Sequence, residues 1–308
     1  MLRAFFVHLS ENRSLRSFSE RSAIGQRISG RFVAGTEIAD AVRVTQAVNR
    51  SGMSVSIDNL GENVTNRDEA QHSAQLYHEI LDAITANQLN ANISLKLTHM
   101  GLDVDEAMAR DIVSGLVAKA AATNPPGFVR VDMEGSPYTQ RTLDFVHELH
   151  RRPGHGNCVG TVIQSYLKRS EADVEKLLSE RIRIRLCKGA YKEPANIAFE
   201  EKADVDANYV KLMKILMKSG VYHGLATHDE KIIREAQAFA TREKIARDSF
   251  EFQMLYGIRR DLQSQLVKDG WRMRVYVPFG TEWYPYFMRR LGERPANVFF
   301  IARNMLRS

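Results

Sequence analysis

Eight short β-branched segments follow one another along this 308-residue chain, and an amphipathic helical pattern follows each of them. The expected strands cover residues 54–60, 91–97, 128–133, 158–164, 182–187, 222–226, 250–255 and 274–277. The expected helices cover residues 67–88, 104–122, 139–150, 170–179, 195–218, 230–246, 259–268 and 283–291. Strands that alternate with helices predict parallel βαβ units. Eight such units predict an α/β fold of the (β/α)8 TIM-barrel type, and a doubly wound open sheet is the alternative.

The composition agrees with one large folded barrel. The chain is 44% hydrophobic and 26% charged, which excludes a disordered or low-complexity protein. Barrels of this class take about 250 residues, so a leading segment remains. We expect an N-terminal helical arm over residues 1–40 and a catalytic barrel over residues 41–308. No Gly-x-Gly-x-x-Gly motif follows a strand, so a dinucleotide-binding fingerprint is absent from the sequence.

The net charge of +6 is concentrated near the N-terminus. Residues 1–36 contain six arginines and two glutamates, so this segment carries +4 of the total. A basic arm packed on the barrel is one interpretation, and a contact with a membrane surface is the other. Because aromatic residues do not interleave with basic runs, we expect no nucleic-acid partner.

The sequence shows no targeting or membrane-spanning segment. No stretch approaches the roughly 18 to 20 apolar residues of a spanning helix, and the N-terminus lacks a secretory apolar region. The two cysteines, Cys158 and Cys187, each lie inside an apolar run and resemble core residues more than a disulfide pair. These features predict a reduced, cytoplasmic protein.

Polar residues stand at the C-terminal end of every expected strand, where barrel enzymes place their active sites. With the apolar and glycine residues beside them, the residues at these ends are Asp58, Asn59, Gly61 and Glu62; Lys96, Thr98 and His99; Asp132, Met133 and Glu134; Gln164; Arg185, Lys188, Gly189, Ala190 and Tyr191; Thr227, His228 and Asp229; Gln253 and Leu255; and Tyr276, Pro278 and Gly280. A buried charge is costly unless it is paired, so charges in these strands mark function.

Lys96 and Asp132 form the first candidate pair, because their strands are expected to be neighbours in the sheet. The pair would serve acid–base chemistry or bind a substrate ammonium group. A structural salt bridge that closes the barrel is one alternative. A Schiff-base lysine at Lys96, as in aldolases, is another.

Two arginines two residues apart, Arg183 and Arg185, share one face of their strand, with one expected lower in the barrel and the other at its rim. The turn that follows, at residues 188–190, contains a glycine and lets a ligand approach the backbone. A solvated lysine in an ordinary turn is the alternative at Lys188. His228 closes the sixth strand, either at the rim or in contact with a ligand.

The last helix carries two adjacent arginines, Arg289 and Arg290. Two neighbouring guanidinium groups suit a carboxylate or a phosphate, and a solvated helix face is the alternative. The histidines lack the spacing of a metal site, so we expect no metal.

Taken in order, these motifs resemble the proline dehydrogenase family, in its monofunctional bacterial form and as a domain of bifunctional proline-utilisation proteins. The matching segments are 94–97 (SLKL), 131–134 (VDME), 164–166 (QSY), 185–191 (RLCKGAY), 226–228 (ATH), 252–257 (FQMLYG), 276–280 (YVPFG) and 289–293 (RRLGE). They cover nearly the whole chain in family order. Two residues, Lys192 and Asp229, depart from the common family pattern.

The resemblance implies a distorted barrel whose last helix lies over the barrel mouth, and a non-covalently bound FAD, with FMN as the alternative. The catalytic residues it implies are Asp132 and Arg185. The implied flavin-binding residues are Met133, Gln164, Arg185, Lys188, Gly189, Ala190, Thr227, His228 and Glu293. The implied substrate-binding residues are Lys96, Leu255, Tyr276, Arg289 and Arg290.

The activity that the resemblance implies is oxidation of L-proline to 1-pyrroline-5-carboxylate, the first step of proline degradation to glutamate. Hydride would pass from ring C5 to flavin N5, and electrons would then pass to a membrane quinone. The basic arm is the candidate for peripheral contact with the inner face of the cytoplasmic membrane. A class I aldolase that uses Lys96 and a basic nucleic-acid-binding protein are the alternatives from other classes, and the oligomeric state stays open.

Overall fold

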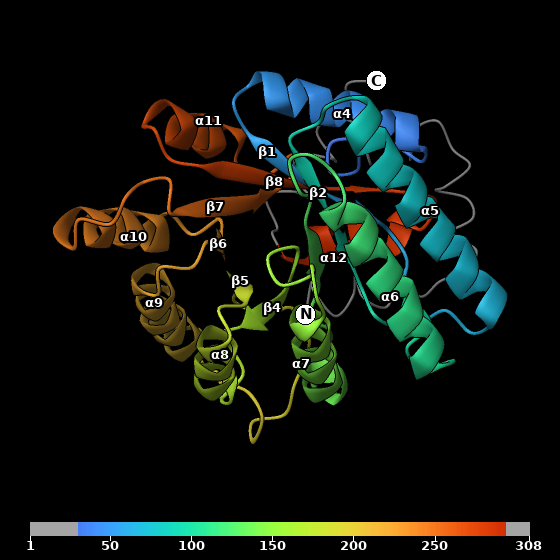
Figure 1. Cartoon of the computed structure of the whole chain (residues 1–308). Helices are drawn as coiled ribbons and strands as arrows, with labels where there is room; N and C mark the ends of the chain where they lie inside the picture. The colour runs from blue at the N-terminus through green and yellow to red at the C-terminus, as the bar shows by residue number, and fades with distance from the viewer. Residues whose placement is uncertain (1–29, 294–308) are drawn as a thin grey trace.

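Eight parallel strands close into a barrel in the computed structural model, which describes residues 30–293, except for the side chains of residues 289–293 (Figure 1). Each strand pairs with the next in parallel, and β8 pairs with β1 to close the ring. The strands are β1 (Ser54–Asn59), β2 (Ala91–Leu95), β3 (Val129–Val131), β4 (Val159–Gln164), β5 (Arg183–Cys187), β6 (His223–Ala226), β7 (Phe250–Leu255) and β8 (Met273–Phe279). The predicted barrel is confirmed, and the open sheet is excluded.

Helices alternate with the strands and surround the barrel. They are α4 (Ile38–Arg50), α5 (Arg67–Ala86), α6 (Glu106–Ala121), α7 (Ser136–Arg151), α8 (Ser170–Ser179), α9 (Lys202–Lys218), α10 (Glu230–Arg242), α11 (Arg260–Lys268) and α12 (Trp283–Glu293). The apolar core lies between the strands and these helices, because the outward residues of each strand, such as Val55 and Ile57 of β1, belong to it. None of the described helices is long and apolar enough to cross a membrane.

The interior of the barrel is polar. Arg185 on β5 donates hydrogen bonds to the hydroxyls of Ser56 on β1 and Ser94 on β2, at 3.2 and 3.1 Å. The Tyr276 hydroxyl on β8 donates to the carboxylate of Asp132, which directly follows β3, at 3.1 Å. Because these strands are not neighbours, the bonds cross the barrel interior. Barrels of this class usually fill that space with branched apolar side chains, so a hydrogen-bonded polar interior indicates a function there.

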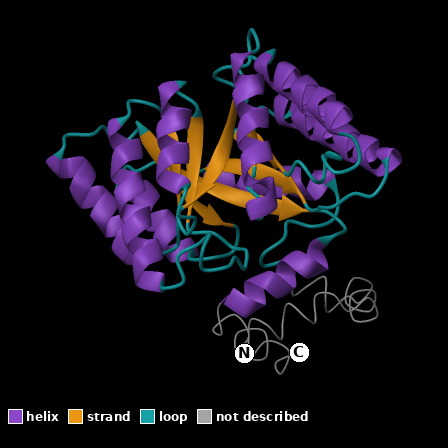
Figure 2. Cartoon of the chain, turned by 90° about the horizontal axis from the view of Figure 1, so that it is seen from below, coloured by secondary structure: helices purple, strands orange, loops and turns teal. Residues whose placement is uncertain are grey.

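The outer ring is completed by a helix that precedes the barrel. Helix α4 packs against β1 and β8, in the position that the helix after the last strand would otherwise occupy. Helix α12 lies instead over the C-terminal mouth, where Trp283 and Phe287 cluster with Leu60 and Ile258, which follow β1 and β7. Figure 2 shows α12, the helix that joins the grey trace, set apart from the helices around the sheet. The predicted placement of the last helix over the mouth is confirmed.

The N-terminal arm lies mostly outside the described residues, which begin at residue 30. Within the described part, Phe32 and Val33 are buried in the same cluster as α12, and the Ala34 amide donates to the Pro278 carbonyl at 2.8 Å. Helix α4 crosses residue 40, where the arm was expected to end. The division between arm and barrel stays a prediction.

One predicted helix begins later than expected. The periodicity predicts a helix from residue 195, whereas α9 begins at Lys202. The reason is backbone pairing in the preceding loop, where Ala198 bridges to Leu167 and the Phe199 amide donates to the Tyr166 carbonyl at 2.8 Å. These bonds keep the segment extended, so the helix starts only after it.

Candidate active site

Arg185 is the centre of the polar cluster at the C-terminal end of the barrel. Its Nε donates to Gln253 Oε1 at 2.6 Å, and its Nη1 donates to Asp132 Oδ1 at 2.7 Å and to Ser94 Oγ. Its Nη2 donates to Ser56 Oγ. A guanidinium has five N–H groups, so one of them has no acceptor among the described residues. Four bonds hold this group rigidly, with one donor left for a ligand.

Asp132 is held by three donors on three strands. Its carboxylate accepts from the Ser94 hydroxyl at 2.7 Å, from Arg185, and from the Tyr276 hydroxyl. The ion-pair partner of Asp132 is therefore Arg185, and the predicted pairing with Lys96 is wrong. Neighbouring strands bring two backbones together, but the long Arg185 side chain reaches Asp132 from across the barrel.

Lys96 follows β2 at the mouth and turns toward the loop after β1. Its ammonium lies 3.4 Å from the Glu62 carboxylate and 3.4 Å from the Gly61 carbonyl oxygen. The side chain is 14% exposed, so the charge is largely shielded from water. Lys96 thus lies at the site, as predicted, with a different partner.

Asp58 was named among the residues at the strand ends, but no role was assigned to it. It is buried on β1 and accepts a hydrogen bond from the Tyr77 hydroxyl at 3.3 Å. Burial, together with the nearby Asp132 carboxylate, raises its pKa to about 6 against the opposing effect of Lys96. A carboxyl group with this pKa changes charge close to neutral pH.

Strand parity is the signal that could have assigned these residues to the site. Asp58 lies two positions after Ser56, and Ser94 lies two positions before Lys96, so all four face the interior. On β7, Gln253 lies two positions before Leu255, so these two residues share one face of the strand as well.

Tyr276 and Leu255 form the wall of the site. Burial, with the Asp132 and Asp58 carboxylates nearby, raises the pKa of Tyr276 well above its usual range, so its hydroxyl stays a donor. The Arg185 guanidinium lies 5.2 Å from the centre of the Tyr276 ring. Leu255 is partly buried against the cluster beneath α12. An apolar and aromatic wall therefore faces the charged cluster.

Three of the predicted flavin residues, Lys188, Thr227 and His228, follow β5 and β6 at the rim of the barrel. Lys188 lies 2.9 Å from the Asp229 carboxylate and also pairs with Asp206. The Thr227 hydroxyl accepts from the Asp229 amide at 3.0 Å, and His228 Nε2 accepts from the Leu255 amide at 3.0 Å. This histidine therefore fixes the end of β7.

The turn after β5 leaves its backbone accessible. Gly189 and Ala190 are exposed, and Gly189 has a φ of +119°, where a Cβ atom would lie 2.2 Å from the Tyr166 ring. Tyr191 is 38% exposed, an unusual position for a large aromatic side chain. Deeper in the site, Met133 is buried and Gln164 Nε2 donates to the Glu134 carbonyl at 3.1 Å.

These features fit a flavin. An exposed glycine turn allows close approach of a flat ring or a phosphate to its backbone, and an exposed tyrosine offers a stacking surface. The remaining N–H of Arg185 suits an acceptor nitrogen. Arg289, Arg290 and Glu293 belong to α12, but their side chains lie outside the described part of the structure, so their roles stay predictions.

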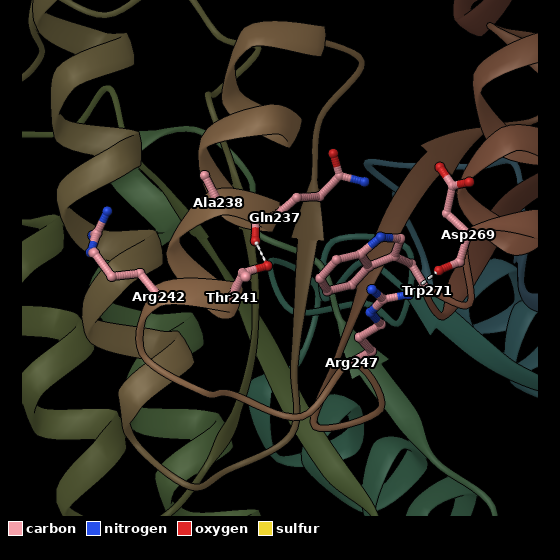
Figure 3. Close-up of a pocket in the computed structure, with 7 residues that line it drawn as sticks. All are labelled: Gln237, Ala238, Thr241, Arg242, Arg247, Asp269 and Trp271. Atoms are coloured by element: carbon pink, nitrogen blue, oxygen red, sulfur yellow. Dashed lines mark hydrogen bonds between the residues drawn. The ribbon is translucent and has the colours of Figure 1, made fainter.

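A metal site and a second cavity are the other features of the molecule that could bind a ligand. Among the residues whose side chains are described, no group of three or more His, Cys, Asp or Glu side chains could hold a metal. A cavity of about 660 Å³ lies at the opposite end of the barrel, between the end of α10 and the start of β8 (Figure 3). It includes Arg247 and Trp271 and shares no residue with the cluster at the mouth.

Comparison with known proteins identifies the family. The family model for proline dehydrogenase matches residues 41–303. Proline dehydrogenase 1 of Bacillus subtilis (strain 168) is 41% identical over 308 residues, which is 100% of both chains. A proline dehydrogenase of Deinococcus radiodurans is 41% identical over 283 residues, covering 91% of this chain and 90% of that protein.

A solved structure shows the same barrel. Proline utilization A from Bdellovibrio bacteriovorus, inactivated by N-propargylglycine, matches with a TM-score of 0.81 and 25% identity. The match covers 87% of this chain and 32% of that one, so this chain corresponds to about a third of the larger protein.

Proposed function

Because the chain belongs to the proline dehydrogenase family, we propose that it oxidises L-proline to 1-pyrroline-5-carboxylate with FAD as its flavin and a membrane quinone as electron acceptor. Membership gives proline dehydrogenase activity, the first step of proline catabolism, and the family is flavin-dependent. The observation that carries the proposal is the cluster of Arg185, Asp132 and Tyr276 beneath α12. The cluster combines charged side chains, which can bind the charged groups of an amino acid, with an aromatic side chain, which can contact the apolar ring of proline.

The substrate carboxylate is bound by cations in this proposal. Arg289 and Arg290 are adjacent on α12, which lies over the mouth, and Lys96 supplies a third positive charge from below. Guanidinium groups bind carboxylates in forked geometry. Leu255 and Tyr276 contact the apolar ring.

Asp132 acts on the substrate amine. A proline nitrogen must be neutral before hydride can leave the adjacent carbon, so a fixed carboxylate beside it is useful. Asp132 keeps a fixed position because Arg185, Ser94 and Tyr276 all donate to it. It orients the amine and accepts its hydrogen bond while Lys96 holds the carboxylate.

The flavin completes the site. When bound, it would supply a two-electron oxidant for the hydride that leaves ring C5 of the substrate. The residues that would hold it are Met133, Gln164, Arg185, Lys188, Gly189, Ala190, Thr227, His228 and Glu293. Arg185 would direct its remaining N–H toward the ring, and the exposed turn at Gly189 would admit the phosphates. FMN in place of FAD is the alternative.

The proposed electron acceptor, a membrane quinone, bears on where in the cell the protein works. A protein that delivers electrons to a membrane quinone works at a membrane surface, so we place this one in the cytoplasm with peripheral contact through residues 1–36. The support is the net charge of +4 on that segment, which favours anionic lipid.

An anaerobic absorbance spectrum tests the proposal. The purified protein is expected to show the visible bands of oxidised FAD, and L-proline is expected to bleach them, whereas D-proline is expected to leave them unchanged. Analysis of the released flavin distinguishes FAD from FMN. Protein that takes up no flavin, or whose flavin stays oxidised in L-proline, would contradict the proposal.

A further inference from the structure

A second group of charges lies in the barrel at its N-terminal end, opposite the mouth. Arg183 is the first residue of β5, and Arg130 and Arg274 are the second residues of β3 and β8. Glu251, the second residue of β7, lies 2.6 Å from Arg274 Nε. We name these four residues the N-terminal cluster. It contains three guanidinium groups and one carboxylate.

Arg183 is held in place without a polar partner. Its guanidinium lies 4.2 Å from the centre of the Phe128 ring and 4.9 Å from that of Tyr222. Its Nε is buried and has no hydrogen-bond partner, and its side chain makes no ion pair with any residue in the described range. An arginine that is ordered by two rings but donates to nothing is prepared to bind a ligand.

Arg130 adds a second unpaired charge beside it. It is buried, it lies 4.6 Å from the centre of the same Phe128 ring, and its Nε also has no partner. Its Nη1 donates to the carbonyls of Thr161 and Arg183, at 2.8 and 2.7 Å. Burial, with Arg185 and Arg183 nearby, lowers the pKa of Arg130 well below its usual range. The position is short of negative charge.

Glu251 is the carboxylate of the cluster, and it raises the pKa of both Arg183 and Arg130, but it forms no ion pair with either of them among the described residues. The Glu251 carboxylate already accepts from Arg274 Nε, from the Tyr222 hydroxyl at 2.9 Å and from Gln253 at 2.6 Å. Burial lowers the pKa of His223 to about 3, so this ring is neutral. Burial also raises the pKa of the Cys158 thiol.

Other arginines at this end are engaged. Arg272 lies 3.8 Å from Asp248, and Arg247 donates to the Asp269 carbonyl beside the cavity in Figure 3. Arg274 is paired with Glu251 and donates to the Val55 carbonyl at 2.7 Å. The two unpaired guanidinium groups of the N-terminal cluster are therefore distinct from the rest of this face.

We propose that the N-terminal cluster binds a small oxyanion, of the phosphate or carboxylate class, with Arg183 as its main donor. Planar N–H pairs of a guanidinium match two oxygens of one anion. A buried positive charge without a partner is costly, and a bound anion removes that cost. The site is separate from the flavin and substrate residues, because it lies at the other end of the barrel.

Isothermal titration of the full-length, flavin-loaded protein with inorganic phosphate tests this site, with acetate as the carboxylate arm, at constant ionic strength. Wild-type protein is expected to bind at least one of the two anions. Arg183→Gln is expected to weaken that binding by about tenfold or more, since it removes charge-assisted hydrogen bonds. The matched control Arg181→Gln changes an exposed arginine just before β5 and is expected to bind like wild type.

A second variant covers the case in which Arg183→Gln does not fold. Arg183→Lys keeps the charge but lacks the forked donors, so its affinity is expected to fall between those of wild type and Arg183→Gln. Absence of binding by both anions to wild-type protein would overturn the proposal. Equal affinity in wild type and Arg183→Lys, or in wild type and folded Arg183→Gln, would overturn it as well, because the anion would then bind elsewhere.

Discussion

Arg185 shows how one side chain organises a site. It joins β5 to β1, β2, β3 and β7 through four hydrogen bonds, and so fixes the donors and acceptors around the ligand space. A lysine carries the same charge but has neither the planar fork nor the reach of a guanidinium. Arg185 therefore contributes geometry as well as charge.

Arg185→Lys is expected to slow flavin reduction by L-proline by about 10²-fold or more, because two or more charge-assisted hydrogen bonds are lost. Stopped-flow absorbance under anaerobic conditions measures the rate. Arg181→Lys is the matched control, since Arg181 is exposed, and it is expected to keep the wild-type rate. A wild-type rate in Arg185→Lys would remove the positioning role.

Asp58 predicts a pH dependence of stability. Its pKa is about 6 in the folded protein, against 3.8 for an ordinary aspartate, so the folded state binds the proton more tightly. The stability that comes from this proton is present below about pH 4 and is lost as the pH rises through 6. Relative to Asp58→Asn, the wild type is expected to lose up to about 3 kcal/mol across this range.

Urea unfolding of both proteins at pH 4, 5, 6 and 7, without flavin, measures that difference. Asn cannot titrate, so the variant provides the baseline. The difference in unfolding free energy is expected to change up to pH 6 and then to level off. A difference that is constant with pH, or of the opposite sign, would show that Asp58 is not buried as described.

At the scale of elements, the turn after β5 is the part of the site most sensitive to one methyl group. Gly189→Ala places a Cβ atom at the Tyr166 ring in a backbone region that favours glycine. The turn must then move, and flavin affinity is expected to fall about tenfold or more. Flavin titration of the apoprotein, followed by fluorescence, measures the change.

Gly115→Ala is the matched control for this prediction. Gly115 lies inside α6, and a Cβ atom there would meet no heavy atom within 4 Å. The variant is expected to bind flavin normally and to gain about 0.5–1 kcal/mol of stability, because alanine favours helix. Equal flavin affinity in Gly189→Ala and wild type would contradict the proposed role of the turn.

The elements were easier to predict from the sequence than the pairing of their side chains. All eight strands were predicted from short β-branched or apolar runs, each followed by a helical pattern. Helix α4 was not among the predicted helices, and the expected end of the arm at residue 40 falls inside it. Nothing in its own pattern shows that it would complete the outer ring. Lys96 and Asp132 were paired by strand adjacency, but partners across a barrel depend on side-chain length and strand tilt, which a linear pattern does not contain.

At the scale of the whole molecule, the basic arm predicts membrane affinity. Residues 1–29 contain five arginines and two glutamates. A chain that begins at residue 30 retains the buried Phe32 and Val33, so the barrel is expected to stay intact. Its co-sedimentation with anionic vesicles is expected to fall several-fold, since each basic residue near such a surface contributes about 1 kcal/mol.

Neutral vesicles serve as the control, and both proteins are expected to sediment equally poorly with them. If the shortened chain bound anionic vesicles as well as the full chain does, the prediction would be wrong, because residues 1–29 would then contribute nothing to membrane binding.

The position of α4 has a consequence for the order in which the molecule is completed. During synthesis, α4 leaves the ribosome before β1, and β8 ends at Phe279. All strands, together with the helix that covers the seam between β8 and β1, have therefore been made before α12. The barrel can close with its mouth open, and the helix that lies over the mouth is added after it is closed.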